Sequence, residues 1–137
     1  MTALAVGDLL PEQAYAVTRA DLVAYAAASG DQNPIHQDEE VALSVGLPGV
    51  IAHGMYTLAL VGRAVSGWTG GAEVVELGSK FTSPVVVPAD GGAQVVVRGT
   101  VKSVADGLVT LALEVTCDGQ RVLGMPRAVV RESAVRA

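Results

Sequence analysis

The stretch HGMYTLALVGRAVSGW, residues 53–68, decides the fold. As a helix it would be apolar on nearly all sides, so we expect it to be enclosed by other elements. Its longest apolar run, residues 55–65, holds Thr57 and Arg63 and falls far short of the roughly 20 apolar residues that cross a bilayer. The stretch therefore predicts a buried helix that begins near Gly54, not a membrane span.

After this helix the sequence changes to a period of two. Apolar and polar residues alternate, which is typical of half-buried strands. Asp106-Gly107 and Asp118-Gly119 lie between the alternating segments, and Asp-Gly favours a two-residue hairpin turn. We expect an antiparallel meander of three strands, with two further strands earlier in the chain. The predicted strands cover residues 14–17, 73–82, 95–104, 109–117 and 122–131.

Before the long helix, the sequence predicts two short ones. Thr18 precedes Asp21 by three residues, as in a capping box, and the apolar run that follows ends at Gly30. A second helix is expected to start at Asp38 and end at Gly46.

Helices first and strands afterwards predict an α+β plan with a single domain over residues 1–137. The long apolar helix can be buried only against the inner face of the curved antiparallel sheet. A sheet wrapped around one central helix is the hot-dog architecture. At 13.9 kDa the chain could bury about two-thirds of its surface in one core.

Composition excludes several classes of function. The formal charge is −5, and the nine Lys and Arg residues are scattered, so nucleic-acid binding is not expected. A single cysteine, Cys117, cannot form a disulfide framework and fits a reducing compartment. The N-terminal residues have no basic segment before an apolar one, so we expect no targeting peptide and a cytoplasmic location. With two histidines and one cysteine, no metal site is expected either.

The densest polar cluster is SGDQNPIH, residues 29–36. Asp31 and His36 are separated by a turn that contains Pro34, and this spacing lets both side chains converge. A carboxyl group beside an imidazole is an acid/base pair, since the ordinary pKa values are about 3.9 and 6.5. The alternative is that Asp31 forms an Asx turn and His36 only caps or packs.

The run YAAASGDQNPIHQDEEVA, residues 25–42, resembles the signature of the MaoC-like (R)-specific enoyl-thioester hydratase/dehydratase family. AHGM, residues 52–55, and FTSPVVVPADG, residues 81–91, resemble further parts of that family. Within it, the chain is most similar to the catalytic subunit of two-subunit β-hydroxyacyl-carrier-protein dehydratases of mycolic-acid-type fatty acid synthesis.

The resemblance implies that Asp31 and His36 are catalytic, without metal or cofactor. We assign His36 as the principal base and Asp31 as its partner and proton donor, although spacing alone does not divide these roles. A helix N-terminus can hold the negative charge that develops on a thioester oxygen, so we expect the Gly54 N–H to bind it. The alternative for Gly54 is a packing role.

Other residues near these motifs are candidates for substrate binding. Asn33 could orient the pair or simply form the turn, and His53 is expected to be structural although it adjoins the site. The remaining candidates could line an acyl tunnel or pack in the core. They are Val50, Ile51, Met55 and Tyr56.

The expected activity is (R)-specific dehydration of a 3-hydroxyacyl thioester, or hydration of the enoyl thioester, on coenzyme A or acyl-carrier protein. Two alternatives are a hot-dog thioesterase and a non-catalytic acyl-binding subunit of a heterodimeric dehydratase. The presence of both Asp31 and His36 disfavours the second. An exposed sheet edge and a very apolar helix predict a homodimer or a heterodimer with a related hot-dog subunit.

Overall fold

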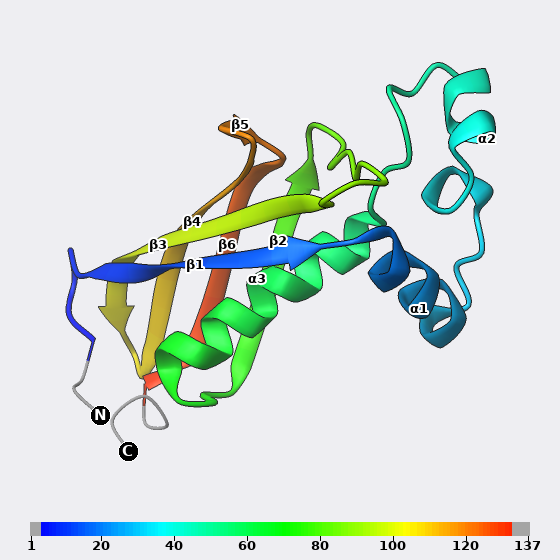
Figure 1. Cartoon of the computed structure of the whole chain (residues 1–137). Coiled ribbons are helices and arrows are strands. Elements are labelled where there is room, and N and C mark those ends of the chain that lie inside the picture. The colour runs from blue at the N-terminus through cyan, green and yellow to red at the C-terminus, as the bar shows by residue number, and fades with distance from the viewer. Residues whose placement is uncertain (1–3, 133–137) are drawn as a thin grey trace.

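In the computed structural model, which describes residues 4–132, a curved antiparallel sheet wraps one side of a long helix (Figure 1). The strand order is β1-β3-β4-β6-β2, and the short β5 pairs with β4. This arrangement confirms the expected α+β hot-dog fold. The strands are β1 (Leu9–Val17), β2 (Val74–Phe81), β3 (Ala93–Ala105), β4 (Leu108–Cys117), β5 (Gln120–Arg121) and β6 (Leu123–Arg131).

The central helix α3 (Gly54–Thr69) is less enclosed than its sequence suggested. Leu60, Val61 and Val65 are buried against the sheet, but Met55 is 59% exposed and Arg63 is also exposed. The expectation of burial on nearly all sides was therefore wrong for the single chain, because the open sheet covers only one side of the helix. No helix among residues 4–132 has both the length and the apolar character of a membrane span.

The expected meander is present in β3, β4 and β6, with one addition. Asp106 and Gly107 have φ values of 55° and 76°, and they join β3 to β4 as the Asp-Gly turn predicts. Asp118 and Gly119 form a similar turn, but it leads first into β5 and only then into β6. The N-terminal strand β1 starts five residues before the predicted segment of residues 14–17.

A glycine on the sheet allows close packing between the sheet and the helix. A Cβ on Gly99 of β3 would lie 3.0 Å from Leu10 and 3.1 Å from both Leu113 and Trp68. The Trp68 indole donates a hydrogen bond to the Pro11 carbonyl at 2.7 Å. This contact fixes the C-terminal part of α3 against β1.

Two short helices lie beyond the N-terminal end of α3 (Figure 1). In α1 (Arg19–Ser29) the capping box of Thr18 and Asp21 is present, and Gly30 ends the helix with a φ of 81°. The second, α2 (Glu39–Ser44), is capped by the Asp38 side chain, which accepts from the Val41 N–H. Both helices confirm the predicted segments.

The segment between these helices and α3 is fixed to the sheet side of the molecule by backbone hydrogen bonds. Ile51 forms an antiparallel bridge with Val86, and the Ala52 N–H donates to the Val85 carbonyl at 2.9 Å. The Ile51 N–H donates to the Ile35 carbonyl at 3.3 Å. Residues 34–36 are thereby held next to the start of α3.

Candidate active site

Asp31 lies on a turn held by local hydrogen bonds. Its N–H donates to the Ser29 hydroxyl, and its Oδ1 accepts from the Asn33 N–H, each at 3.2 Å. The Asn33 Oδ1 in turn accepts from the Ile35 N–H at 3.2 Å and caps η1 (Pro34–His36). Asp31 thus forms the Asx-type bond expected of a turn residue, yet its side chain remains exposed and lines a pocket.

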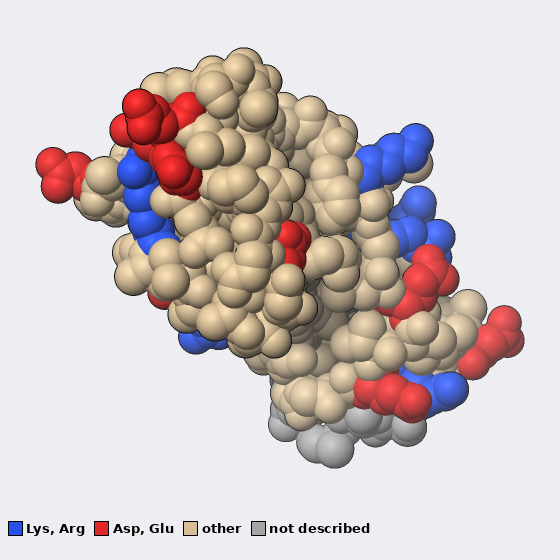
Figure 2. Space-filling view, turned by 90° about the vertical axis from the view of Figure 1, so that its right-hand side faces the viewer, with Lys and Arg blue, Asp and Glu red and all other residues tan. Residues whose placement is uncertain are grey.

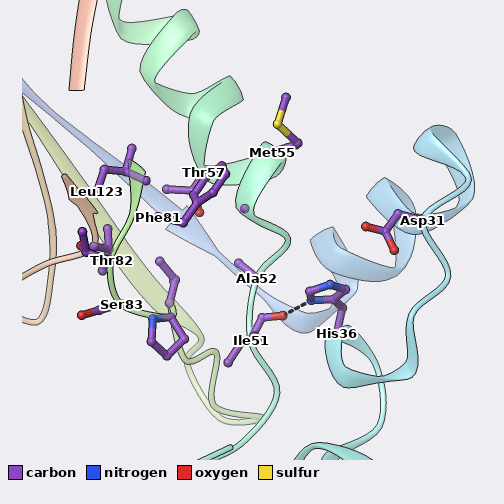
Figure 3. A pocket seen from close by; sticks show the side chains of 14 residues that line it. Asp31, His36, Ile51, Ala52, Met55, Thr57, Phe81, Thr82, Ser83 and Leu123 are labelled. Carbon is purple, nitrogen blue, oxygen red and sulfur yellow. Dashed lines mark hydrogen bonds between the residues drawn. The ribbon is translucent and has the colours of Figure 1, made fainter. Parts of the chain in front are cut away.

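The orientation of His36 is set by a backbone carbonyl. His36 is only 7% exposed, and its Nδ1 lies 2.7 Å from the Ile51 oxygen (Figure 3). Because a carbonyl can only accept, Nδ1 must carry the proton. In the neutral imidazole, Nε2 is therefore the atom that can accept a proton.

His53 lies directly against the other two residues and is almost fully buried. Its ring stacks on that of His36 with centroids 3.9 Å apart and planes 24° apart, and its Nε2 donates to the Asp31 carbonyl at 3.1 Å. Burial is the largest influence and lowers the pKa of His53; the hydrogen bond to the Asp31 carbonyl raises it by less, the neighbouring His36 lowers it again, and the charge of Asp31 has the smallest, raising effect. A neutral His53 therefore supports the backbone of Asp31.

Gly54 begins α3 next to this cluster. His53, its N-cap, makes no side-chain bond to the end of the helix, so the first N–H groups of α3 have no such cap. A Cβ on Gly54 would lie 3.0 Å from the Phe81 ring, so glycine allows the ring to cover this end of the helix. Gly54 lines the same pocket.

A pocket of about 470 Å³ joins these groups to an apolar wall from the sheet side (Figure 3). Asp31 and His36 lie at one end, and Thr82, Ser83 and Leu123 lie at the other. The other lining residues are Ile51, Ala52, Gly54, Met55, Thr57, Phe81, Pro84, Val85 and Val122. A largely apolar lining with an acid/base pair at one end suits an acyl compound with one reactive polar group.

The face formed by α1 and α2 carries its acidic and basic groups mainly around its margins, and most of the area between them is uncharged (Figure 2). Arg19 and Glu39 form an ion pair at 2.9 Å and join α1 to α2.

The expected site residues divide into two groups. Asp31, His36, Gly54, Ile51 and Met55 line the pocket. The others lie outside its lining: Val50 and His53 are buried, Asn33 is exposed on the turn, and Tyr56 packs edge-on against Tyr25 at 5.3 Å.

The opposite wall was not anticipated as part of the site. It is formed by the end of β2, by the segment after it and by the start of β6. The stretch FTSPVVV, residues 81–87, carried the only sequence signal for this wall, through its likeness to a family motif. Nothing in its composition indicated that it lies across from Asp31.

The ligand atoms of Asp31, His36 and His53 lie within 4.8 Å of one another, close enough to raise the question of a metal ion. An imidazole binds a metal through a lone pair in the plane of its ring. Two stacked rings direct these lone pairs side by side, not toward one point, and two of the four ring nitrogens are bonded to carbonyls. The geometry favours proton transfer over metal binding.

The family of this chain follows from its match to known sequences. The family model described as a MaoC like domain matches residues 5–119, most of the chain. The chain belongs to the MaoC-like dehydratase family. A curated relative, 3-hydroxyacyl-thioester dehydratase X of Mycobacterium tuberculosis, is 39% identical over 85 residues. The match covers 62% of the MaoC-like chain but only 30% of that relative, so the chain spans less than half of its length.

Solved structures share the fold along almost the whole MaoC-like chain. One, titled a MaoC-like dehydratase, has a TM-score of 0.90 and 38% identity, covering 93% of this chain and 40% of that one. The R-hydratase PhaJ1 of Pseudomonas aeruginosa has a TM-score of 0.81 and 28% identity, with 93% and 82% covered. The complex of ChsH1 and ChsH2 from Mycobacterium tuberculosis has a TM-score of 0.82 at 23% identity, with 93% and 98% covered, which shows the fold alone.

Proposed function

We propose that this chain catalyses the dehydration of (3R)-hydroxyacyl thioesters and the reverse hydration of trans-2-enoyl thioesters, with Asp31 and His36 as the acid/base pair. The observation that carries the proposal is the position of both side chains at one end of a pocket whose wall includes the start of α3. The names of two similar proteins, a thioester dehydratase and an R-hydratase, describe the two directions of one reaction.

The proton balance of the reaction needs one acceptor and one donor. In dehydration, His36 Nε2 takes the α-proton while protonated Asp31 gives its proton to the departing 3-hydroxyl, which leaves as water. The carbon–oxygen bond breaks as the double bond forms. The pair ends as imidazolium and carboxylate and is reset by one proton transfer between them. Exchanging the two roles would leave the balance unchanged.

The negative charge that develops on the thioester oxygen needs a donor that is already in place. The Gly54 N–H at the start of α3 offers one, and the helix dipole adds a favourable field. Gly54 lines the pocket, and because it has no side chain the Phe81 ring can pack against it and shield this end of α3. The substrate would place its thioester here and its α and β carbons beside His36.

A direct assay tests the proposal against the thioesterase alternative. Purified protein with crotonyl-CoA should consume the enoyl absorbance, yield (3R)-hydroxybutyryl-CoA and release no thiol. Release of free coenzyme A, measured with a colorimetric thiol reagent, would instead indicate a thioesterase. Absence of both reactions with coenzyme A and carrier-protein substrates of increasing length would favour the non-catalytic acyl-binding subunit.

We also propose that the active form is a dimer, with either a second copy or a related hot-dog subunit. Strand β2 is the last strand of its sheet, and its end reaches the pocket at Phe81, which is 56% exposed. Val74 and Val75 on the same strand are also exposed. An open edge with exposed apolar side chains favours pairing. Light scattering and activity of the chain expressed alone separate the two kinds of dimer.

A further inference from the structure

We infer that the Thr57 hydroxyl is a second donor to the thioester oxygen, alongside the Gly54 N–H. The inference rests on the proposed function, but its structural basis is separate from the Asp31/His36 pair. Thr57 lines the pocket, is only 3% exposed, and lies one helical turn after Gly54 (Figure 3). Residues three apart share a face of a helix, so we expect the Gly54 N–H and the Thr57 hydroxyl to lie toward the same part of the pocket.

Among the described residues no hydrogen bond involves the Thr57 hydroxyl, and its oxygen is not one of the fully buried atoms that lack a partner, so it keeps access to the pocket although the residue is only 3% exposed. A buried threonine in a helix ordinarily donates to the carbonyl four residues earlier. That carbonyl, on His53, already accepts from both the Tyr56 and Thr57 N–H groups, at 3.0 and 3.2 Å. The hydroxyl is therefore left to the pocket.

Thr69 near the end of the same helix shows the ordinary arrangement. It is fully buried, its hydroxyl donates to the Val65 carbonyl at 2.8 Å, and it accepts from the Ala72 N–H at 3.3 Å. The two threonines have the same chemistry and similar burial, but only Thr57 faces a cavity and lacks a partner. A polar group in so buried a position is normally hydrogen-bonded, so we expect the Thr57 hydroxyl to donate to an oxygen of the ligand.

The helix geometry places the hydroxyl where such an oxygen would lie. Side chains of a helix lean toward its N-terminus, so Thr57 leans back toward Gly54. An oxygen that accepts from the Gly54 N–H is then within reach of the Thr57 hydroxyl as well. Two donors would hold the oxygen more strongly as it becomes negative in the transition state than in the ground state.

The substitution Thr57→Val keeps the shape of the side chain and removes only the hydroxyl. We expect kcat for crotonyl-CoA hydration to fall about 10- to 100-fold with little change in KM, since the bond strengthens in the transition state. Thr57→Ser should keep most of the activity. Thr69→Val, the matched control, should lower the melting temperature but leave kcat within about twofold of the wild type.

A binding comparison tests Thr57 even if the wild type catalyses nothing. Butyryl-CoA and its thioether analogue, in which a methylene group replaces the carbonyl, differ only at the oxygen. Calorimetry should show tighter binding of the thioester to the wild type and a smaller preference in Thr57→Val. An unchanged preference, kcat of Thr57→Val within twofold of an active wild type, or equal loss in the serine and valine variants would overturn the inference. An inactive wild type with the expected preference would count against the proposed reaction alone.

Discussion

The turn that carries Asp31 and the sheet that faces it are held in place by different means. Strands β3, β4 and β6 form a continuous backbone ladder, with fully buried side chains such as Val95 and Leu111 on the inner face. Residues 31–36 have no such ladder, and side-chain bonds of Asp31 and Asn33 shape the turn. Stability therefore resides mainly in the sheet, and the reactive groups lie where the backbone is least regular.

The largest effect is expected from a substitution in the turn, which should lower the activity and leave the stability unchanged. Asp31→Asn should lower kcat about 10²- to 10⁴-fold, because an amide cannot give or take a proton at this position. The melting temperature should stay near the wild-type value since the side chain is exposed. Steady-state hydration kinetics and thermal unfolding measure both. Asp90→Asn, on an exposed turn outside the pocket, is the control, and wild-type-like turnover of Asp31→Asn would contradict the mechanism.

A substitution in the sheet should instead lower the stability of the fold and leave the catalytic rate of the folded protein unchanged. Leu111 is fully buried on β4, and Leu111→Ala should lower the free energy of unfolding by about 2–5 kcal/mol. Urea titration measures the loss. The fraction that remains folded should retain its kcat, whereas Ala112→Ser on the exposed neighbouring position should change neither quantity. A large loss of kcat per folded molecule would mean that the two regions are not separable.

A smaller effect is expected at Asn33, where the turn itself is weakened. Asn33→Ala removes the acceptor for the Ile35 N–H and should cost about 1 kcal/mol of stability. Activity should fall several-fold as well, because the same turn carries Asp31. Asn33→Asp keeps an acceptor oxygen and should be milder in both assays. Equal losses for the two variants would show that the hydrogen bond is not the cause.

The smallest expected effect comes from pH and concerns His53. Its pKa is lowered in the folded chain, so below about pH 6.5 the unfolded chain binds a proton that the folded chain does not. The contribution of His53 to stability is thus constant above that pH and declines as the pH falls below it. Urea midpoints between pH 7.5 and 5 should show this decline. His53→Gln, which cannot titrate, should show a shallower one, and an identical slope would refute the explanation.

Regular elements could be predicted because their signals are local. The capping pair of Thr18 and Asp21 and the Asp-Gly turn at Asp106 depend on residues a few positions apart, and the structure contains both. The exposure of one side of α3 could not be read from its composition, because it depends on how far the sheet curves. That is a property of the whole fold.

The candidate site was accessible to sequence reasoning only in part. The turn from Asp31 to His36 could be identified because the residues are close in the chain. The opposite wall, from Phe81 to Val85, is brought there by strand pairing over a long range, and no local pattern reports such a pairing. Thr57 was read as a polar interruption of an apolar helix, and only the structure shows that, unlike Thr69, it lines the pocket and has no hydrogen-bond partner for its hydroxyl among the described residues.

The backbone of Ile51 links the reactive turn to the sheet side without using its side chain. Its carbonyl accepts from His36, its N–H donates to the Ile35 carbonyl, and it forms the bridge with Val86. An alanine scan would not detect this link, because every residue except proline supplies the same backbone N–H and carbonyl. Relatives could therefore vary freely in residue type at this position and still inherit the same imidazole orientation.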